Sequence, residues 1–162
     1  ALAEKIYLGY THDFHQDLSA HLTFGWENWS ALGEIPLSTQ SGGIALSRNW
    51  EDTYYYAAGI ERRLPGDWIL NFGIGYDTSP VDKEDRTADM PIDRQIRYSF
   101  GVGRELPSGM TITGSFVYAD YGKSKIESDG LILPGGPTRF SGDYSSNDII
   151  FFAVSANWKL GK

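Results

Sequence analysis

Three histidines near the start of the chain are the first side chains whose chemistry could matter. His12 and His15 lie on either side of a turn, and His21 follows shortly after them. Two histidines at such close spacing could hold a metal ion, but a solvated turn explains them more simply. We therefore predict no metal site and no cofactor. We expect His21 to join a network of hydrogen bonds.

Charged residues at the polar positions of alternating segments form a second group: Glu27, Glu61, Arg97 and Glu105. If these positions face a narrow interior, the charges could form an ion path or a proton relay. Charges in such an interior must be paired, so a salt-bridge network along the interior wall is the interpretation we favour. We assign His21 to the same polar network.

Arginines in the connecting segments could meet an anionic ligand: Arg48, Arg86 and Arg94. A guanidinium group binds a carboxylate through paired hydrogen bonds, so each is a candidate ligand-binding residue. Three acids lie close to the last two arginines in the sequence: Asp85, Asp89 and Asp93. Opposite charges this close favour a structural role for Arg86 and Arg94, in which they tie this loop to the rim of the fold through these acids.

A short apolar stretch in another connecting segment is a further candidate for ligand binding: Leu131, Ile132 and Leu133. Apolar side chains gathered on a loop often mark an interaction site. The stretch is either a landing surface for a hydrophobic ligand or a piece that folds inward, and the sequence leaves both open. No Ser-His-Asp set can be assembled from the sequence, so we predict no catalytic residues and no enzyme activity.

One alternating pattern identifies the elements that carry these residues. In the segment Asp67–Asp77, large apolar residues at even positions alternate with mostly small or polar residues at odd positions. Successive side chains of a β-strand point to opposite faces, so such a segment has one apolar and one polar face. Seven segments repeat the pattern, and we predict strands at about Lys5–Phe14, Leu18–Trp29, Asp52–Leu64, Asp67–Asp77, Arg94–Leu106, Met110–Tyr121 and Asp148–Leu160.

Composition narrows the class of protein. The 162 residues include no cysteine, and a net charge of -7 argues against a nucleic-acid partner. The sequence lacks the run of about 20 apolar residues that a membrane-spanning helix needs. Alternating strands of about ten residues suit an antiparallel transmembrane β-barrel, with lipid outside and a polar lumen inside.

Short and long connections alternate strictly between the predicted strands. The short ones are His15-Gln16-Asp17, Pro65-Gly66 and Pro107-Ser108-Gly109, and the long ones are about 30–51, 78–93 and 122–147. Outer-membrane barrels have short periplasmic turns and long extracellular loops, so we place the short turns in the periplasm. Seven strands leave two edges unpaired, which lipid does not tolerate, so we expect a missing amino-terminal half or a second copy to close the barrel. An eighth strand within Gly43–Trp50 is the competing explanation.

Aromatic residues gather at the ends of the apolar faces: Trp26, Trp68, Tyr76, Tyr118 and Trp158. They could stack on a sugar or a cofactor, but Trp and Tyr also line the two interfaces of a membrane, and we favour that role. Arg62 and Arg104 break the apolar pattern near strand ends, where a long side chain can reach the lipid headgroups.

Several short motifs, taken in order, are similar to one known family. Asp67-Trp68-Ile69-Leu70 is followed by Gly-Ile-Gly-Tyr-Asp-Thr-Ser-Pro-Val at residues 73–81, and the next loop runs from Arg86 through Pro91 to Arg94. Trp29-Ser30, Asp52-Thr53-Tyr54 and Gly142 fit the same order. These residues resemble the carboxy-terminal half of the FadL family over essentially the whole chain. Ile92 departs from the pattern, because aspartate is usual there.

The resemblance implies a fourteen-stranded barrel plugged by an amino-terminal hatch. Residues 1–162 would be one barrel domain, or the seven-stranded carboxy-terminal half, without the hatch. It also implies a place in the bacterial outer membrane, contact with lipid and lipopolysaccharide, and passive transport of hydrophobic compounds. Long-chain fatty acids are the first candidate substrate, with aromatic hydrocarbons as another. Removing the apolar side chains of Leu131–Leu133 is then expected to weaken uptake.

Two other classes of protein share parts of this pattern. A small eight-stranded outer-membrane barrel, structural or adhesive, would need an eighth strand and would fill its lumen with side chains. A soluble ligand-binding barrel of the lipocalin type would turn its apolar face inward, the inverse of our assignment. A chain that stays folded and monomeric in plain buffer would identify the soluble class.

Overall fold

Strands are the main secondary structure of the residues that the structure describes. The computed structural model describes residues 3–32, 34–39, 42–47, 49–86, 91–128, 132–133, 136–137 and 140–158. Side chains are described for residues 3–32, 49–86, 91–127 and 141–158. No helix in this described part is long and apolar enough to cross a membrane.

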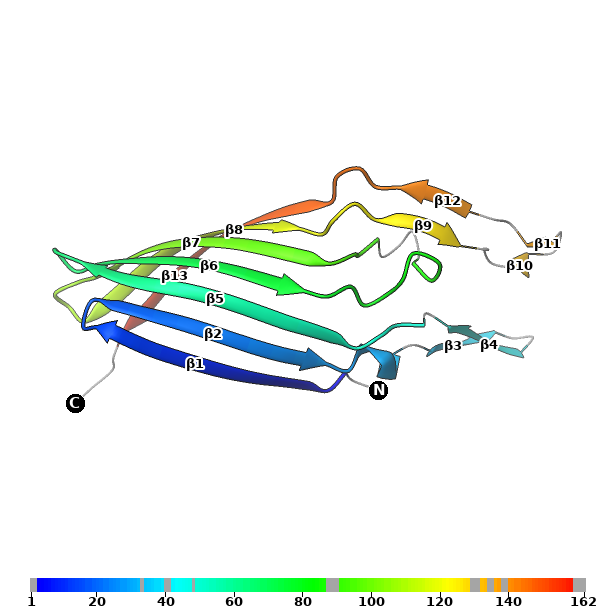
Figure 1. Ribbon diagram of the computed structural model, residues 1–162, viewed down its shortest axis with the longest axis horizontal. Helices are drawn as coiled ribbons and strands as arrows, with labels where there is room; N and C mark the ends of the chain where they lie inside the picture. The colour runs from blue at the N-terminus through cyan, green and yellow to red at the C-terminus, as the bar shows by residue number, and fades with distance from the viewer. Residues whose placement is uncertain are drawn as a thin grey trace.

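Seven long strands form one antiparallel sheet (Figure 1). They are β1 (Lys5–His15), β2 (Leu18–Glu27), β5 (Thr53–Leu64), β6 (Trp68–Asp77), β7 (Gln95–Glu105), β8 (Met110–Asp120) and β13 (Asp148–Trp158). Their order across the sheet is β1-β2-β5-β6-β7-β8-β13, so each long strand pairs with the next along the chain. The seven predicted strands and the all-β antiparallel class are confirmed.

Tight turns join β1 to β2, β5 to β6 and β7 to β8 at one end of the sheet (Figure 1). Gly66 and Asp67 have φ angles of 81° and 62°, in the left-handed region that a strand does not use. The strand predicted to begin at Asp67 therefore begins one residue later, at Trp68. Gly109, with φ of 77°, donates its N–H to the carbonyl of Leu106 at 2.9 Å and closes the turn before β8.

The second strand ends earlier than its predicted end at Trp29. A short 3-10 helix, η1 (Trp29–Leu32), follows β2 instead. The side chain of Asn28 accepts the backbone N–H of Ala31 at 3.3 Å and so caps this helix. Asp52, just before β5, accepts the backbone N–H of Ser30 at 3.2 Å. These two bonds turn the chain away from the sheet where the strand was expected to continue.

Among the described residues, two of the long connections carry short hairpins beyond the other end of the sheet (Figure 1). Within them β3 (Glu34–Thr39) pairs with β4 (Gly42–Ser47), β9 (Lys125–Ser128) with β12 (Phe140–Asp143), and β10 (Ile132–Leu133) with β11 (Gly136–Pro137). The segment Gly43–Trp50, considered above as a hidden eighth strand, contributes to β4 but not to the main sheet. Its hydrogen-bonding partner is the neighbouring β3, so the main sheet keeps seven strands.

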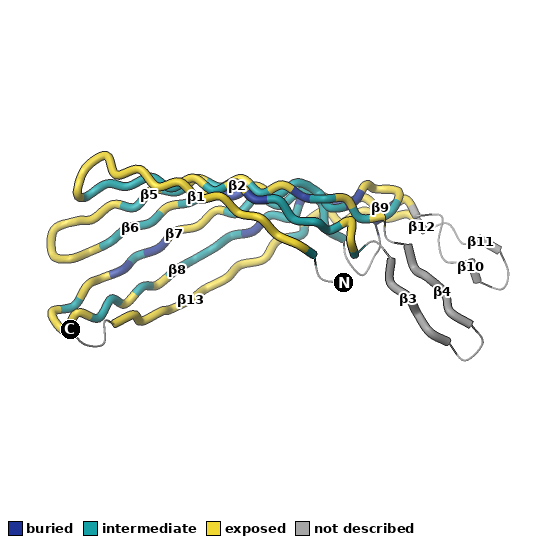
Figure 2. Tube along the Cα trace, turned by 90° about the horizontal axis from the view of Figure 1, so that it is seen from below, coloured by how far each residue is buried: buried dark blue, intermediate teal, exposed yellow. Residues whose placement is uncertain are grey.

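The two faces of the sheet differ in the size and polarity of their side chains. Even-numbered positions carry large apolar residues that lie open, such as Phe72 at 53% exposed. One apolar row crosses five neighbouring strands: Ile60, Phe72, Phe100, Phe116 and Phe152. On the opposite face, Gly25, Gly75 and Gly101 are buried. Figure 2 shows that the sheet is curved. The apolar face is therefore convex and the face of small and polar residues is concave.

The sheet is open at both edges. Among the described residues, β1 pairs only with β2, and β13 pairs only with β8. The sheet curls so far that β13 passes behind β5 and β6 in Figure 1. β1 begins at the end that carries the long loops, whereas β13 ends beside the tight turns. The sheet thus has the form of half a barrel, as predicted.

Candidate functional site

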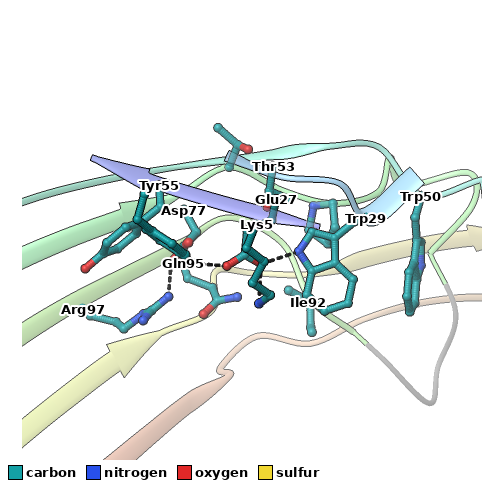
Figure 3. Close-up of a pocket in the computed structure, with 13 residues that line it drawn as sticks. Lys5, Glu27, Trp29, Trp50, Thr53, Tyr55, Asp77, Ile92, Gln95 and Arg97 are labelled. Carbon is teal, nitrogen blue, oxygen red and sulfur yellow. Dashed lines mark hydrogen bonds and ion pairs between the residues drawn. The ribbon is translucent and has the colours of Figure 1, made fainter. Parts of the chain in front are cut away.

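The concave face is hollowed near the end that carries the long loops. A cavity of about 430 Å³ lies there, between β1, β2, β5, β6, β7 and adjoining loop residues (Figure 3). Strand register positions its walls, because Lys5 pairs with Glu27 across β1 and β2. On the next strands Tyr55 pairs with Asp77, and Asp77 pairs with Gln95. We call this hollow the lumen cavity.

Glu27 is the centre of one half of the lumen cavity. Its carboxylate lies 3.0 Å from Nζ of Lys5 and accepts a hydrogen bond of 2.7 Å from Nε1 of Trp29. The hydroxyl of Tyr7 donates to the same carboxylate. Lys5 also lies 5.5 Å from the centroid of the Trp29 ring, within cation–π range. Three donors therefore satisfy Glu27, which holds an aromatic wall in place.

Arg97 and Asp77 form the other half of the lumen cavity. The guanidinium group of Arg97 forms an ion pair with Asp77. Its central carbon lies 5.4 Å from the centroid of the Tyr55 ring. Nε of Arg97 is buried and has no hydrogen-bond partner among the described residues. Arg97 therefore retains one donor that its described neighbours do not use.

Two glycines keep room for the tyrosine rings on the cavity wall. A Cβ atom added at Gly25 would lie 2.5 Å from a ring carbon of Tyr7, which is closer than real contacts allow. A Cβ atom added at Gly75 would lie 3.2 Å from the hydroxyl of Tyr55. A larger residue at either position would force the neighbouring tyrosine ring to move, so both glycines leave room for these rings.

Two tryptophans from the connection between β2 and β5 stand beside the charged groups (Figure 3). The rings of Trp29 and Trp50 meet edge to face, with centroids 5.5 Å apart and planes at 77°. Such an arrangement is favourable for aromatic pairs. The cavity thus combines paired charges with an aromatic surface, a lining suited to a molecule with both a polar and an apolar part.

Three residues predicted to share a polar network lie outside the lumen cavity. Nδ1 of His21, on β2, is 3.0 Å from the hydroxyl oxygen of Thr11. Glu61 lies near the tight turns, and Arg63 pairs with it at 3.2 Å. Glu105 is the last residue of β7. The structure therefore brings Glu27 and Arg97 together in one cavity and places the other three at different levels of the sheet.

Arg86 links two of the long loops. Only 5% of it is exposed, and its Nε donates to the carbonyl of Ile92 at 2.8 Å. Nη1 donates to the carbonyl of Lys125 at 2.7 Å and Nη2 to the carbonyl of Val81 at 3.2 Å. Nη2 also lies 3.4 Å from the carboxylate of Asp93. Because these acceptors lie both in the loop after β6 and in β9, Arg86 fastens that loop to β9.

Arg86 and three other buried residues form a small packed unit, which we call the rim core: Val81, Arg86, Ser124 and Ile126. The hydroxyl of Ser124 donates to the carbonyl of Pro91 at 2.5 Å. On the surface, Lys83 lies 3.3 Å from the carboxylate of Glu127. Hydrogen bonds with Glu127 and Glu84 raise the pKa of Lys83, so it stays protonated. The two loops are therefore joined by buried polar contacts as well as by exposed charges.

The structure describes the remaining candidates for ligand binding to different extents. Arg94 pairs with Asp120 at the end of β8, at 3.2 Å. Arg48 and Leu131 lie outside the described residues. Ile132 and Leu133 form β10, but their side chains lie outside the described part. A role for these loop residues in ligand binding stays a prediction.

Comparison of the chain with known protein families identifies one family that matches it. The family described as "Outer membrane protein transport protein (OMPP1/FadL/TodX)" matches residues 1–159. The chain belongs to this family. The resemblance to the FadL family drawn from the motifs around Asp67–Val81 and Arg86–Arg94 is thereby confirmed.

Curated proteins similar to this FadL-family chain carry the name long-chain fatty acid transport protein. The one from Escherichia coli K12 is 23% identical over 119 residues, which cover 68% of this chain and 27% of the relative. The one from Escherichia coli O6:H1 is 26% identical over 84 residues, covering 51% of this chain and 19% of the relative. The chain thus spans about a quarter or less of the curated relatives it matches.

A solved structure shares the fold of the chain. It is described as the crystal structure of a Pseudomonas aeruginosa FadL homologue, and it superposes with a TM-score of 0.85 at 21% sequence identity. The match covers 94% of this chain and 34% of that chain. At this identity the likeness concerns the fold, and it agrees with a sheet that is part of a larger FadL-type barrel.

Sequence reasoning missed several residues of the lumen cavity: Lys5, Tyr7, Tyr55 and Asp77. Their signal was present but incomplete, because all four have the odd numbers of the polar face. The register between paired strands supplies what the odd numbering lacks, namely which residues lie at the same level of the sheet. The tight turn at Pro65-Gly66 sets Leu64 opposite Trp68, and the same register sets Tyr55 opposite Asp77. Counting back from each tight turn would have placed these residues at one level.

Proposed function

We propose that this chain forms part of the wall of a FadL-type channel in the bacterial outer membrane, through which hydrophobic compounds pass without an energy source. Long-chain fatty acids are the first candidate substrate, supported by the names of the curated relatives. The observation that carries the proposal is the curled sheet itself. Its convex face is apolar, as a lipid-facing wall must be, and its concave face holds the lumen cavity.

The lining of the lumen cavity supports a route for amphipathic molecules. An apolar chain gains about 25 cal/mol for each Å² removed from water, so aromatic walls such as those of Trp29 and Trp50 would hold it reversibly. The guanidinium group of Arg97 lines the cavity and would face a polar head group. Lys5 and Arg97 already have acidic partners, which would keep the attraction for an anion moderate and allow release. No residue has to perform a chemical step in this scheme.

The complete channel would need more wall than this sheet supplies. β1 and β13 each have one neighbour in the described structure, and an unpaired strand edge is not stable in lipid. The missing strands would come from an amino-terminal half of the same protein or from a second copy. The proposal therefore concerns the intact barrel, to which this chain contributes the lumen cavity and the rim core.

Uptake by cells tests the proposed function directly. Cells that depend on the intact protein for growth on oleate should take up labelled oleate, and uptake should continue when the energy supply to the outer membrane is removed. Deleting the protein should abolish most of this uptake. Uptake that is unchanged by deletion would reject transport and would favour a structural or adhesive barrel.

Filling the lumen cavity should slow transport. Gly75→Leu places a branched side chain against Tyr55 on the concave face, where a Cβ atom alone would come within 3.2 Å of that residue. We expect a severalfold loss of oleate uptake at an equal amount of protein in the outer membrane. Ile74→Leu is the matched control, because Ile74 is the adjacent residue on the convex face and is 50% exposed. Equal uptake by both variants would show that substrate does not pass this part of the wall.

A further inference from the structure

Two arginines stand on the convex face among apolar side chains. Arg62 on β5 pairs in register with Leu70 of β6. Arg104 on β7 pairs in register with Ile112 of β8. Both arginines occupy even positions, which elsewhere on these strands carry the apolar row, and both are exposed. A cation on a face that meets lipid is costly unless an anion or water reaches it, so these two positions need a physical explanation.

Neither arginine forms an ion pair with an acid in the part of the chain that the structure describes. The ion pairs of the described residues include neither Arg62 nor Arg104. The contrast with the neighbouring arginine is direct, because Arg63 points to the concave face and pairs with Glu61 at 3.2 Å. The guanidinium carbon of Arg104 instead lies 5.1 Å from the centroid of the Trp68 ring. That stacking orients the group while leaving its hydrogen-bond donors available.

The two arginines lie near the same end of the sheet and within reach of one ligand. They are two strands and two residues apart, a separation of about 12 Å between their Cα atoms by standard strand spacing and rise. Two arginine side chains can meet between such positions. Both lie near the tight turns, and Trp68, which is 41% exposed, stands between them at the depth where tryptophan marks a membrane interface.

The convex face carries the opposite charge at its other end. Asp52, Asp120 and Asp148 occupy even positions beside the long loops. Asp52 accepts a hydrogen bond from Nε1 of Trp26 at 3.1 Å, and Asp120 is paired with Arg94. An anionic headgroup is therefore attracted at the end with the tight turns and not at the end with the long loops.

We propose that Arg62, Arg104 and Trp68 form a binding site for the phosphate of an anionic phospholipid in the periplasmic leaflet. The two guanidinium groups would bind the phosphate oxygens, the Trp68 ring would lie against the glycerol region, and the acyl chains would run along the apolar convex face. The inference rests on the membrane placement in the proposed function, but not on transport.

Spin-labelled lipids test the site in the intact protein reconstituted in phosphatidylcholine bilayers. Phosphatidylglycerol and phosphatidylcholine, each labelled on the acyl chain, report the fraction of lipid immobilised at the protein surface. We expect the protein to prefer phosphatidylglycerol, by up to about fivefold for each arginine near the headgroups. The double variant Arg62→Gln, Arg104→Gln should lose the preference. Arg63→Gln should retain it, because Arg63 faces the lumen, and high salt should weaken it.

The outcomes separate this inference from the proposed function. A preference that persists in the double variant, or that disappears equally in Arg63→Gln, would overturn the lipid site. Immobilised lipid without any headgroup preference in the unmodified protein would also overturn it, while leaving the membrane placement intact. An absence of immobilised lipid of either kind would contradict the membrane placement itself. Gel mobility of boiled and unboiled samples should be equal among variants, which confirms that each one is folded.

Discussion

Arg86→Ala is expected to open the rim core while the seven-stranded sheet stays folded. The substitution removes hydrogen bonds to the carbonyls of Ile92, Lys125 and Val81 and leaves Asp93 without its cation. Asp93 is partly exposed, so the main loss is that of the carbonyl hydrogen bonds, and a hydrogen bond to a charged group typically contributes about 1.5–3 kcal/mol. Because the bonds join two loops and touch no strand of the main sheet, the cost should fall on loop stability alone.

Hydrogen exchange at two loop amides measures this effect. The N–H of Glu127 bonds to the carbonyl of Lys83 at 3.1 Å, and the N–H of Tyr144 bonds to the carbonyl of Ser124 at 2.9 Å. Both should exchange faster in Arg86→Ala, on the order of a hundredfold for a loss near 3 kcal/mol. Lys83→Ala is the matched control, because the side chain of Lys83, which lies in the same loop as Arg86, forms only exposed ion pairs with Glu84 and Glu127. Equal exchange in both variants would show that Arg86 does not hold the loops together.

Phe72→Arg is expected to impair insertion of the protein into a bilayer. Phe72 lies at the middle of β6 on the convex face, and its ring centroid is 5.0 Å from that of Phe100. An arginine near the middle of the lipid face of a barrel costs about 2–4 kcal/mol. The free energy of unfolding from phospholipid bilayers, measured by denaturant titration of the intact protein, should fall by that amount.

The matched control for Phe72→Arg is Asn71→Arg on the same strand. Asn71 points to the concave face and pairs in register with Glu61, so a new arginine there meets water and a carboxylate. We expect a much smaller loss of stability from Asn71→Arg. A similar loss from both substitutions would mean that the two faces of β6 do not meet different solvents.

The main sheet could be predicted because side chains of a strand point alternately to its two faces, so that every second residue is apolar. Even positions such as Phe72, Phe100 and Phe152 repeat the apolar face on each strand, and Pro65-Gly66 marks a tight turn. The ends of the strands were predicted less accurately where a side chain competes with the hydrogen bonds of the sheet. The hydrogen bond between Asn28 and the N–H of Ala31, which ends β2, leaves no mark in the alternating pattern.

The lumen cavity and the rim core could be predicted only in part. Glu27 and Arg97 were assigned to the polar face by position alone, but bringing them into one cavity required the register of the three strand pairings from β2 to β7. Arg86 looked like a partner of nearby acids. It does pair with Asp93, but three of its hydrogen bonds go to backbone carbonyls, and a carbonyl acceptor has no signature in the residue type.

The central claim is that the even face meets lipid and the odd face meets water. The chain has no cysteine, so single-cysteine variants along β7 can carry a spin label without background. Collision rates of the label with oxygen, which dissolves in lipid, and with a water-soluble nickel chelate should alternate from residue to residue. We predict oxygen maxima at Tyr98, Phe100 and Val102 and nickel maxima at Arg97, Ser99 and Gly101. Nickel maxima at the even positions and oxygen maxima at the odd positions would identify a soluble barrel with an apolar interior. An absence of alternation would contradict the half-barrel account.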